Sequence, residues 1–452
     1  MLSALEPYHP DNGSAVVRWL SEAQSTDSLR VRRVPLHALA DWAFEPETGN
    51  LRHRSGRFFS VEGIGVCSSF GSIREWSQPI INQSDVGILG LLIADGDGAL
   101  QVLVQRKVEP GNMNVAQASP TVQATHSNYT RVHGGTAPPY LHYFLDPPAG
   151  AVLVDQLQME QAARYCGKRN RNMIVRVQAD EVPVGIDHRW VAVPELLSLA
   201  QCPNALNLDT RSVLSCLPVA CFGPALPAPE DAPFPARVRG SLTAECDETC
   251  LTAIAQWRAR LDAQFSMHVR ALPLREVAGW QYDGDILAHE SGRFFEVLGV
   301  SIQAPTREVP AWDQPLIRGR GPGVVGFLCQ QRGRTLRFLV RGVLEPGDPH
   351  VRVGPTLQCV PDNHRATPLF FDEIVHAPDS HVRLRAVQSE EGGRFYHDER
   401  LLVVVELPPD VPLDVPPNFM WMTVREIKEM IGRHGCVNIE ARSLIACLPV
   451  GA

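Results

Sequence analysis

The chain has 452 residues, of which 44% are hydrophobic and 20% charged, a composition typical of a globular protein rather than a disordered or fibrous one. It has no run of about 18 apolar residues and no basic start followed by an apolar stretch, so we expect neither a membrane span nor a signal peptide, and a cytoplasmic location. A net charge of −8 argues against a nucleic-acid-binding surface. The 11 cysteines include no Cys-x-x-Cys motif and are expected to be reduced.

Predicted helices and strands follow the same order in the two halves of the chain. The first half has a helical pattern at residues 16–20, strand-like apolar runs at 90–93, 100–104 and 173–177, and a helix start at 193–197. The second half has a helical pattern at 252–262, strand-like runs at 324–328, 336–340 and 401–405, and a helix start at 423–427. Turn residues at 95–98 and 332–334 separate neighbouring runs. Each half is therefore predicted to contain hairpins in a mixed sheet with helices on its faces.

A proline-rich segment, residues 221–235, separates the two halves. Proline fixes φ and removes a backbone donor, so this segment is predicted to be a linker rather than a central strand or a helix. The predicted organisation is a first domain at residues 1–220, a linker at 221–240 and a second domain at 241–452.

The two halves are copies of one domain. The motif H-x-S-G-R-F-F at residues 53–59 returns at 289–295, E-P-G at 109–111 returns at 345–347, and C-L-P-V at 216–219 returns at 447–450. A repeat of this length is a whole domain, because solenoid units span only about 20 to 50 residues. Positions kept in both copies are expected to maintain the fold, and positions that differ are expected to report specialisation.

The common motifs of nucleotide and metal enzymes are absent. The sequence has no G-x-G-x-x-G, Walker loop, H-E-x-x-H or G-x-S-x-G, so nicotinamide, ATP, zinc-protease and esterase functions lack their usual support. Residues 105–143 instead combine cationic phosphate donors, amides and aromatic side chains that can stack on a base. This segment is the predicted centre of the first copy's site.

Four segments carry a resemblance to a known family. P-T-V-Q-A-T-x-S-N-Y-T-R-V-H-G-G at 120–135, K-R-N-R-N at 168–172, S-E-E-G-G-R-F-Y at 389–396 and the twin C-L-P-V motifs resemble the NDP-hexose 2,3-dehydratases of deoxysugar biosynthesis, including antibiotic pathways. The resemblance covers almost the whole chain. One departure lies at residues 158–164, Q-M-E-Q-A-A-R, where the family's first half has an S-E-Q-G-S-type motif.

The resemblance implies a substrate, a partner and a fold. It implies a dTDP-linked 4-keto-6-deoxyhexose as substrate, no added cofactor, a homodimer, and an α+β fold class: a tandem duplication of a Nudix-like mixed-sheet α/β/α sandwich domain. The Nudix box that supplies metal-binding carboxylates is absent from both copies, so pyrophosphate hydrolysis is not expected. No metal-binding residues are predicted.

The implied reaction needs few groups. In a 4-keto sugar the C3 hydrogen is acidified by the carbonyl, so its removal gives an enolate, and loss of the C2 hydroxyl leads to a 3,4-diketo-2,6-dideoxy sugar. The protein must supply a base, a partner for the O4 oxyanion and an acid for the departing hydroxyl.

Differences between the copies favour the first as the catalytic pocket. Lys107 stands where the second copy has Val343, His142 where it has Asp372, and Lys168 where it has Asp398; residues 131–135 have no counterpart. The predicted catalytic residues are Lys107, Tyr129, His133 and His142. The predicted substrate-binding residues are Trp76, Gln78, Arg106, Gln123, Asn128, Arg131, Tyr143, Arg164, Lys168, Arg169 and Arg171. A second pocket, vestigial or still ligand-binding, is predicted from Trp312, Gln314, Arg341, Gln358, Asn363, Glu390, Arg394 and Tyr396.

Structural roles compete with these assignments. The E-P-G motifs suit turns, Trp76 and Trp312 suit the core or an interface, residues 168–172 suit a solvated basic loop, and His142 suits a structural role. Two other functions also stay open. One is a non-catalytic nucleotide-sugar-binding protein, since a duplicated fold can keep pockets without chemistry. The other is a Nudix-type nucleotide-sugar diphosphatase, which would release dTMP in the presence of Mg²⁺.

We predict that dehydration of the 4-keto sugar survives EDTA and needs no added nicotinamide, because the elimination requires neither a metal nor a redox carrier. Turnover is to be measured before and after chelation. A preparation that loses turnover with EDTA and regains it with a divalent ion would contradict the prediction.

Overall fold

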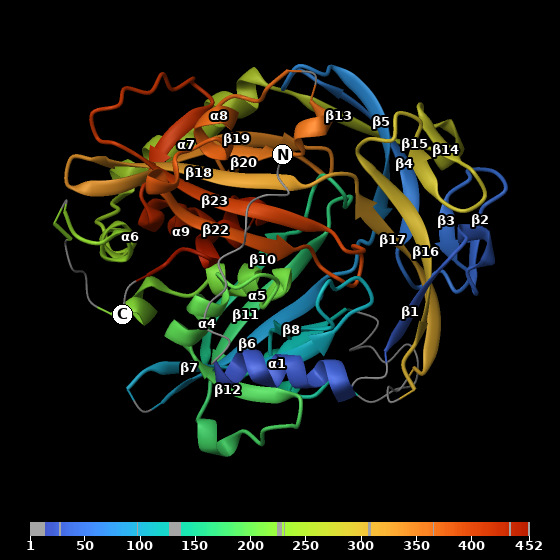
Figure 1. Cartoon of the computed structure of the whole chain (residues 1–452), viewed down its shortest axis with the longest axis horizontal. Coiled ribbons are helices and arrows are strands. Elements are labelled where there is room, and N and C mark those ends of the chain that lie inside the picture. Colours follow the sequence, from blue (N-terminus) through green and yellow to red (C-terminus); the bar gives the residue numbers. More distant parts are fainter. Residues whose placement is uncertain are drawn as a thin grey trace.

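The computed structural model describes residues 14–26, 29–96, 98–125, 137–223, 228–229, 231–305, 309–364, 366–433 and 435–450. The chain has a mixed α+β fold that is mostly sheet and contains two repeated parts (Figure 1). Within the described ranges the strands form two seven-stranded and two five-stranded sheets. None of the helices in those ranges is long and apolar enough to cross a membrane.

The two seven-stranded sheets have matching topology. The first runs β10-β11-β6-β7-β12, with β8 beside β7 and β9 beside β6. The second runs β22-β23-β18-β19-β20, with β24 beside β19 and β21 beside β18. In both sheets the two central strands run parallel to each other (β11 with β6, β23 with β18). Each flanking strand runs antiparallel to the central strand that it pairs with. The strands of the first sheet are β6 (Gly87–Asp95), β7 (Leu100–Val108), β8 (Ala116–Ser119), β9 (Val122–Ala124), β10 (Val152–Met159), β11 (Arg169–Arg176) and β12 (His188–Ala192). Those of the second are β18 (Gly323–Arg332), β19 (Thr335–Glu345), β20 (Asp348–Gly354), β21 (Leu357–Cys359), β22 (Val382–Ser389), β23 (Glu399–Leu407) and β24 (Phe419–Met422).

The five-stranded sheets exchange one strand between the copies. Strand β1 of the first copy pairs with β16 of the second, and β13 of the second copy pairs with β4 of the first (Figure 1). The first-copy strands involved are β1 (Arg30–Val34), β2 (Trp42–Phe44), β3 (Leu51–His53), β4 (Ser60–Ser68) and β5 (Glu75–Asn82). The second-copy strands are β13 (Met267–Leu272), β14 (Trp280–Tyr282), β15 (Leu287–His289), β16 (Phe295–Gln303) and β17 (Ala311–Gly319). Each copy therefore needs the other to complete its outer sheet.

Two equivalent helices meet at the centre of the molecule. Helix α5 (Leu208–Ser215) is buried along its whole length, and α10 (Ile439–Ala446) is buried except at Glu440. Asn207 and Asn438 cap their N-termini by accepting backbone N–H bonds. The other helices are α1 (Ala15–Thr26), α3 (His142–Leu145), α4 (Val193–Leu199), α6 (Phe234–Leu242), α7 (Glu248–Gln264), α8 (Phe371–Val375) and α9 (Val424–Ile431). Short 3-10 turns lie at η2 (Leu36–Ala38), η3 (Ala179–Glu181), η4 (Val219–Phe222), η5 (Leu274–Glu276), η6 (Pro361–Asn363) and η7 (Asp379–His381).

Each central helix sends a buried arginine into the other copy. Arg211 of α5 donates to Gln388 Oε1 and to the Ser389 carbonyl, both at 2.6 Å. Arg442 of α10 donates to Ser212 Oγ at 2.7 Å and to the Met159 carbonyl. Both guanidinium groups are 2% exposed or less. Because a buried arginine is tolerated only with well-placed acceptors, these bonds fix the copies relative to each other.

The E-P-G motifs bring loops of opposite copies together. Gly111 N donates to the Gly392 carbonyl at 2.8 Å, and Gly347 N donates to the Ala162 carbonyl at 2.6 Å. A Cβ on Gly111 would collide with the Phe395 carbonyl, and one on Gly347 with the Tyr165 carbonyl. Glycine is required at both positions because another backbone approaches closely. We name residues 159–166 the first-copy arm and residues 389–396 the second-copy arm.

The predicted order of elements is confirmed. The expected helices correspond to α1, α4, α7 and α9, and the expected hairpins to β6–β7 and β18–β19. Helices α5 and α10 were not predicted, because they are buried nearly all round and lack an amphipathic pattern. The strand exchange was not predicted either, because the sequence pattern of β1 and β13 does not specify which edge they join.

Arg211→Met should lower the free energy of unfolding by about 2 to 4 kcal/mol, since two buried acceptors lose their donor at about 1 to 3 kcal/mol each. Arg176→Met is the matched control. Its ion pair with Asp95 is exposed, and its loss should change stability by about 0 to 1 kcal/mol. Urea unfolding of both variants measures the difference, and equal values would contradict the anchoring role of Arg211.

Candidate functional site

A cavity of about 790 Å³ opens beside the first copy's seven-stranded sheet, and residues of both copies line it. The first copy contributes Lys107, Glu109, Gln123, Glu160, Tyr165, Lys168, Asn170 and Asp209, together with Trp42, Arg57, Phe58 and Phe59 near the five-stranded sheets. The second copy contributes Trp312 and Gln314 of β17 and Glu391, Gly393 and Arg394 of its arm. Its volume is in the range of sites for small organic ligands.

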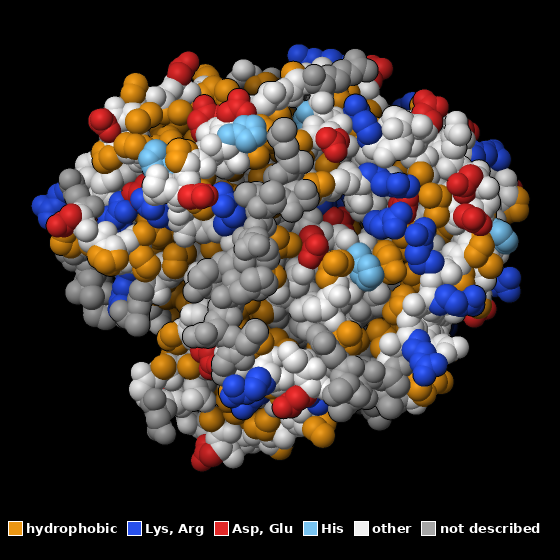
Figure 2. Space-filling model, in the orientation of Figure 1, with side chains coloured by type: hydrophobic (Ala, Val, Ile, Leu, Met, Phe, Trp, Pro, Cys, Tyr) orange, Lys and Arg blue, Asp and Glu red, His pale blue; other side chains and the backbone are white. Residues whose placement is uncertain are grey.

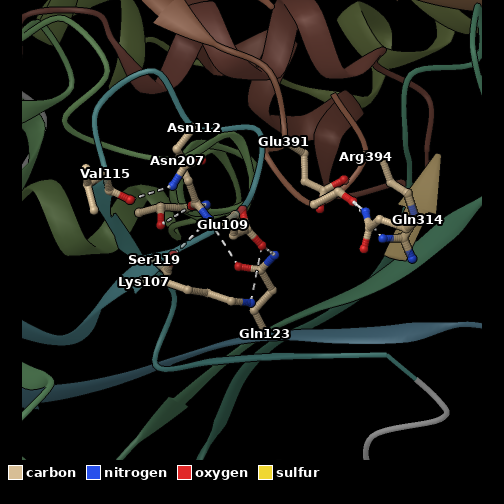
Figure 3. A network of polar contacts seen from close by, with 12 residues as sticks. Lys107, Glu109, Asn112, Val115, Ser119, Gln123, Asn207, Gln314, Glu391 and Arg394 are labelled. Carbon is tan, nitrogen blue, oxygen red and sulfur yellow. Dashed lines mark hydrogen bonds and ion pairs between the residues drawn. The ribbon is translucent and has the colours of Figure 1, made fainter. Parts of the chain in front are cut away.

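A hydrogen-bonded chain holds one wall of the cavity (Figure 3). Lys107 Nζ lies 3.5 Å from Glu109 Oε1, and Gln123 Nε2 donates to the same oxygen at 3.0 Å. Asn207, the cap of α5, donates to Gln123 Oε1 at 3.1 Å. Glu109 is only 9% exposed, and its second oxygen has no hydrogen-bond partner among the described residues. This arrangement orients a lysine ammonium and a buried carboxylate towards the cavity.

A second acidic group lies at the end of β10. Asn170 donates to Glu160 Oε1 at 2.8 Å. Desolvation raises the pKa of Glu160, while the positive charge of Arg442 opposes the shift. Lys168 is 4% exposed, donates to the Asp85 carbonyl, and has its pKa lowered by burial. Lys168 therefore faces the cavity as a largely desolvated cation.

Asp209, in the first turn of α5, is the most strongly perturbed carboxyl of the cavity. It is 3% exposed, and burial raises its pKa well above the usual range, with the negative charges of Glu160, Glu391 and Glu109 adding to the shift. Burial in such an environment disfavours the charged form of the carboxyl group.

The second-copy arm forms the opposite wall. Trp312 donates to Gln314 Oε1 at 2.9 Å, and Gln314 in turn donates to the Gly393 carbonyl at 2.7 Å. Figure 3 shows Gln314, Arg394 and Glu391 grouped opposite the Lys107 chain. Arg394 places its guanidinium 4.2 Å from the centre of the Phe59 ring and donates to Gln83 at 3.3 Å. The arm is thus fixed by its own copy at one end and by the first copy at the other.

The mouth of the cavity is aromatic and basic. Arg57 and Phe58 are exposed there, beside the buried Trp42. Figure 2 shows Lys and Arg side chains gathered over β16 and β17. Arg33, Arg318 and Arg320 pair with the buried Glu296 and do not line the cavity.

At the equivalent position in the second copy, charged side chains pair with one another. Arg400, which replaces Asn170, pairs with Asp398 at 2.6 Å and with Glu390 at 3.1 Å. Val343 replaces Lys107 in the repeat. Glu345, Gln358 and Asn438 keep the carboxylate–amide–cap chain at 3.1 and 2.8 Å. The framework is shared by the two copies, whereas Lys107 and Lys168 occur only in the first copy and line its cavity.

The structure brings together some of the predicted site residues. Lys107, Gln123 and Lys168 line the cavity. Tyr129, His133, Asn128 and Arg131 lie outside the described residues. The remaining first-copy residues named in the prediction lie elsewhere: Trp76, Gln78, Arg106, His142, Tyr143, Arg164, Arg169 and Arg171 do not line the cavity.

These displaced residues have identifiable positions. Helix α3 carries His142 and Tyr143, and its Phe144 packs on Gly90 of β6. Gly90 lies on the face of β6 opposite to that of Gly87 and Leu89, which line the cavity. Arg106 donates to Asp187 at 2.8 Å. Arg171 pairs with Asp155 of β10 at 2.6 Å, on the other side of β11 from Asn170.

The grouping of residues by copy needs correction. Trp312, Gln314 and Arg394 were predicted for the second pocket but line the first copy's cavity. Arg164 was predicted for the first pocket, yet it stacks 4.3 Å from the ring centre of Phe295, and desolvation lowers its pKa to about 10, with Arg400 adding to the shift. The reason is that each arm crosses to the other copy.

The other residues predicted for the second pocket stay with the second copy. Gln358 binds Glu345, burial lowers the pKa of Arg341 beside the same carboxylate, and Asn363 accepts from Phe294 N at 2.9 Å. Glu390 accepts from Gln161 at 2.6 Å, and Tyr396 stacks on His397.

The cavity residues that sequence reasoning missed include Glu109, Glu160, Tyr165, Asp209 and Glu391. Glu109 was noted as part of a turn because the E-P-G motif occurs twice. For Tyr165 and Glu391 a signal existed, since the second copy has Phe395 and the first copy has Gln161 at the matching positions.

Such a cavity, with buried carboxyls, a lysine and a basic mouth, suits acid–base chemistry on an anionic small molecule. Among the described residues no group of three or more His, Cys, Asp or Glu side chains is arranged to hold a metal ion. The family described as NDP-hexose 2,3-dehydratase matches residues 13–217 and 251–448. The chain belongs to this family.

Three relatives are similar over most of their length. A dTDP-4-dehydro-6-deoxy-alpha-D-glucopyranose 2,3-dehydratase of Saccharopolyspora spinosa is 41% identical over 438 residues, covering 95% of this chain and 90% of that protein. A protein of the same name from Streptomyces violaceoruber is 40% identical, and the match covers 95% of both chains. A third, from Amycolatopsis orientalis, is 39% identical, and the match covers 96% of this chain and 89% of that protein.

Asp209→Asn should make the protein relatively more stable as pH rises. A carboxyl whose pKa is raised by folding stabilises the folded state fully below its unfolded pKa of about 3.9, and that contribution is lost as pH rises through the folded pKa. Asparagine has no such loss. The free energy of unfolding of both proteins is to be measured in urea at pH 5 and pH 8. The value for the variant, relative to that of the wild type, should be higher at pH 8 than at pH 5. An unchanged difference between pH 5 and pH 8 would contradict a raised pKa of Asp209.

Proposed function

We propose that this protein is a dTDP-4-keto-6-deoxy-D-glucose 2,3-dehydratase, a carbon–oxygen lyase, and that the first copy's cavity is its active site. The observation that carries the location is the Lys107–Glu109 pair, which faces the open cavity in the first copy and has no lysine counterpart in the second. Three relatives at about 40% identity that carry this name support the reaction.

The cavity offers complementary groups for each part of the substrate. Its mouth has aromatic surfaces at Trp42 and Phe58 for the thymine base, and Arg57 and Arg394 for the diphosphate. The sugar then reaches the interior, where Lys107, Glu109 and Gln123 lie. Tyr129, His133, Asn128 and Arg131 stay proposed contributors to this pocket.

Lys107 is the proposed partner of the O4 oxyanion. Removal of the C3 proton moves negative charge onto O4, and an ammonium already held by Glu109 can stabilise that charge without reorganising. Asp209, whose pKa is raised by burial, adds to the polar wall. The elimination then needs only proton transfers, so we propose that no cofactor takes part.

The second copy is proposed to support the first. Arg400 occupies the equivalent interior and neutralises Glu390 and Asp398, so little charge is left there for a substrate. The second copy instead contributes its arm and β17 to the active cavity.

Further features of the proposal concern the whole protein. We propose that each repeat is a Nudix-like α/β/α sandwich, with boundaries at residues 1–220 and 241–452 around a linker at 221–240. We also propose a homodimer that acts in the cytoplasm on a deoxysugar for antibiotic biosynthesis, without binding nucleic acid or membrane.

Lys107→Met should lower kcat by about 10²-fold or more, as expected for loss of an oxyanion partner, while dTDP still binds. The assay follows loss of one water from the 4-keto sugar by mass spectrometry. Lys428→Met, which removes a lysine outside the cavity, is the control and should keep the wild-type kcat if folded. A wild-type protein that binds dTDP without forming product would favour the non-catalytic binding function.

A further inference from the structure

We propose that Glu391, delivered by the second copy's arm, is the catalytic residue that takes the C3 proton of the sugar and returns it to the departing C2 hydroxyl. This inference rests on the proposed function and deepens it. The catalytic cavity would then require both copies of the duplicated domain, with Lys107 from one and the acid–base carboxyl from the other.

Geometry places Glu391 opposite the Lys107 chain. Its carboxylate lines the cavity, and Tyr165 Oη donates to Glu391 Oε2 at 3.2 Å. A Cβ on Gly393 would collide with Glu391 Oε1 and would lie 3.5 Å from Glu109 Oε1. The two carboxylates therefore approach one point from opposite walls, which Figure 3 shows.

The other cavity carboxyls have different surroundings. Glu109 is held by Lys107 and Gln123, and Glu160 is held by Asn170. Asp209 is buried deeper, and burial raises its pKa. Glu391 faces the carboxyl groups of Glu109, Glu160 and Asp209 and the positive charges of Lys107 and Arg394. Desolvation, with Glu109 adding to it, raises the pKa of Glu391 to about 7, a value suited to a group that must both accept and donate a proton near neutral pH.

The proton transfers balance with one carboxylate. In the gluco configuration the C3 hydrogen and the C2 hydroxyl lie on the same face of the ring. Glu391 takes the C3 proton, and the C–H electrons form the enolate, whose O4 charge faces Lys107. The enolate electrons then form the C2–C3 double bond as the C2–O bond breaks, and the proton on Glu391 leaves with the hydroxide as water. The enol finally loses its O3 proton and gains one at C2.

The arms differ at the residues that this role requires. In the first-copy arm the matching residues are Gln161, Ala163 and, in place of Phe395, Tyr165. Gly393 gives the Glu391 carboxylate space that a Cβ would occupy, and Tyr165 supplies the hydroxyl that Phe395 lacks. Ala163 stands at the position of the first-copy arm that matches Gly393, so the backbone conformation of the arm does not require glycine there. Gly393 is explained instead by the Glu391 carboxylate, which occupies the space of a Cβ.

The test compares Glu391→Gln with Glu373→Gln, the same substitution at an exposed position of α8. Glu391→Gln should lower kcat by about 10²-fold or more while dTDP affinity stays within about threefold. Glu373→Gln should match the wild type. In the wild type, kcat/KM should fall as pH drops below about 7, because the base must be ionised at the start.

A second variant covers the case in which Glu391→Gln does not fold. Gly393→Ala keeps the carboxylate but displaces it, and should lower kcat with dTDP binding retained. If the wild type is active and either folded variant has a kcat within about threefold of the wild-type value, the role of Glu391 is overturned. The proposed function would then still stand. Wild-type protein that forms no dehydrated sugar would instead refute the proposed function itself.

Discussion

The exchange of buried arginines between the two copies is the constraint on which the other features depend. Arg211 and Arg442 are buried. Arg211 finds its acceptors at the end of β22, and Arg442 finds its acceptors in α5 and at the end of β10, each in the opposite copy. Desolvating a guanidinium is expensive unless its donors are satisfied, so helices α5 and α10 can pack together only in the arrangement that provides those acceptors. That arrangement brings each arm under the E-P-G turn of the other copy, and it also allows β1 and β13 to join the opposite outer sheets.

Crossed arms explain how a duplicated domain can be symmetric in framework and asymmetric in chemistry. Both copies keep the capping asparagine, the glutamine and the buried glutamate, because these hold the helix and the turn together. Around this framework the copies diverge. One interior is closed by the ion pairs of Arg400, whereas the other keeps a cavity with Lys107 and receives Glu391 from outside. A substitution in the second copy can therefore change the first copy's cavity without touching the first copy's own sequence.

The concentration of carboxyls in the cavity has a cost for the fold. Burial raises the pKa of Glu160, Asp209 and Glu391, negative neighbours add to each shift, and Lys107, Lys168 and Arg394 offset only part of it. Groups kept in such an environment commonly serve function rather than stability. Arg57 and Arg394, with the aromatic rings of Trp42 and Phe58, are the groups of the cavity lining that suit a negatively charged nucleotide.

The sequence by itself determined the duplication, the order of helices and strands, and the family, because repeated motifs and local hydrophobic patterns lie in neighbouring residues. It also predicted Lys107, Gln123 and Lys168 as site residues, and all three line the cavity. Only the tertiary structure decided which copy each arm serves. Arg394, Trp312 and Gln314 lie far along the chain from Lys107 but share its cavity, while Arg164 lies with the second copy. The physical reason is that strand exchange and buried cross-copy bonds depend on which edges and acceptors meet in space, and periodicity within one segment carries no information about its partner.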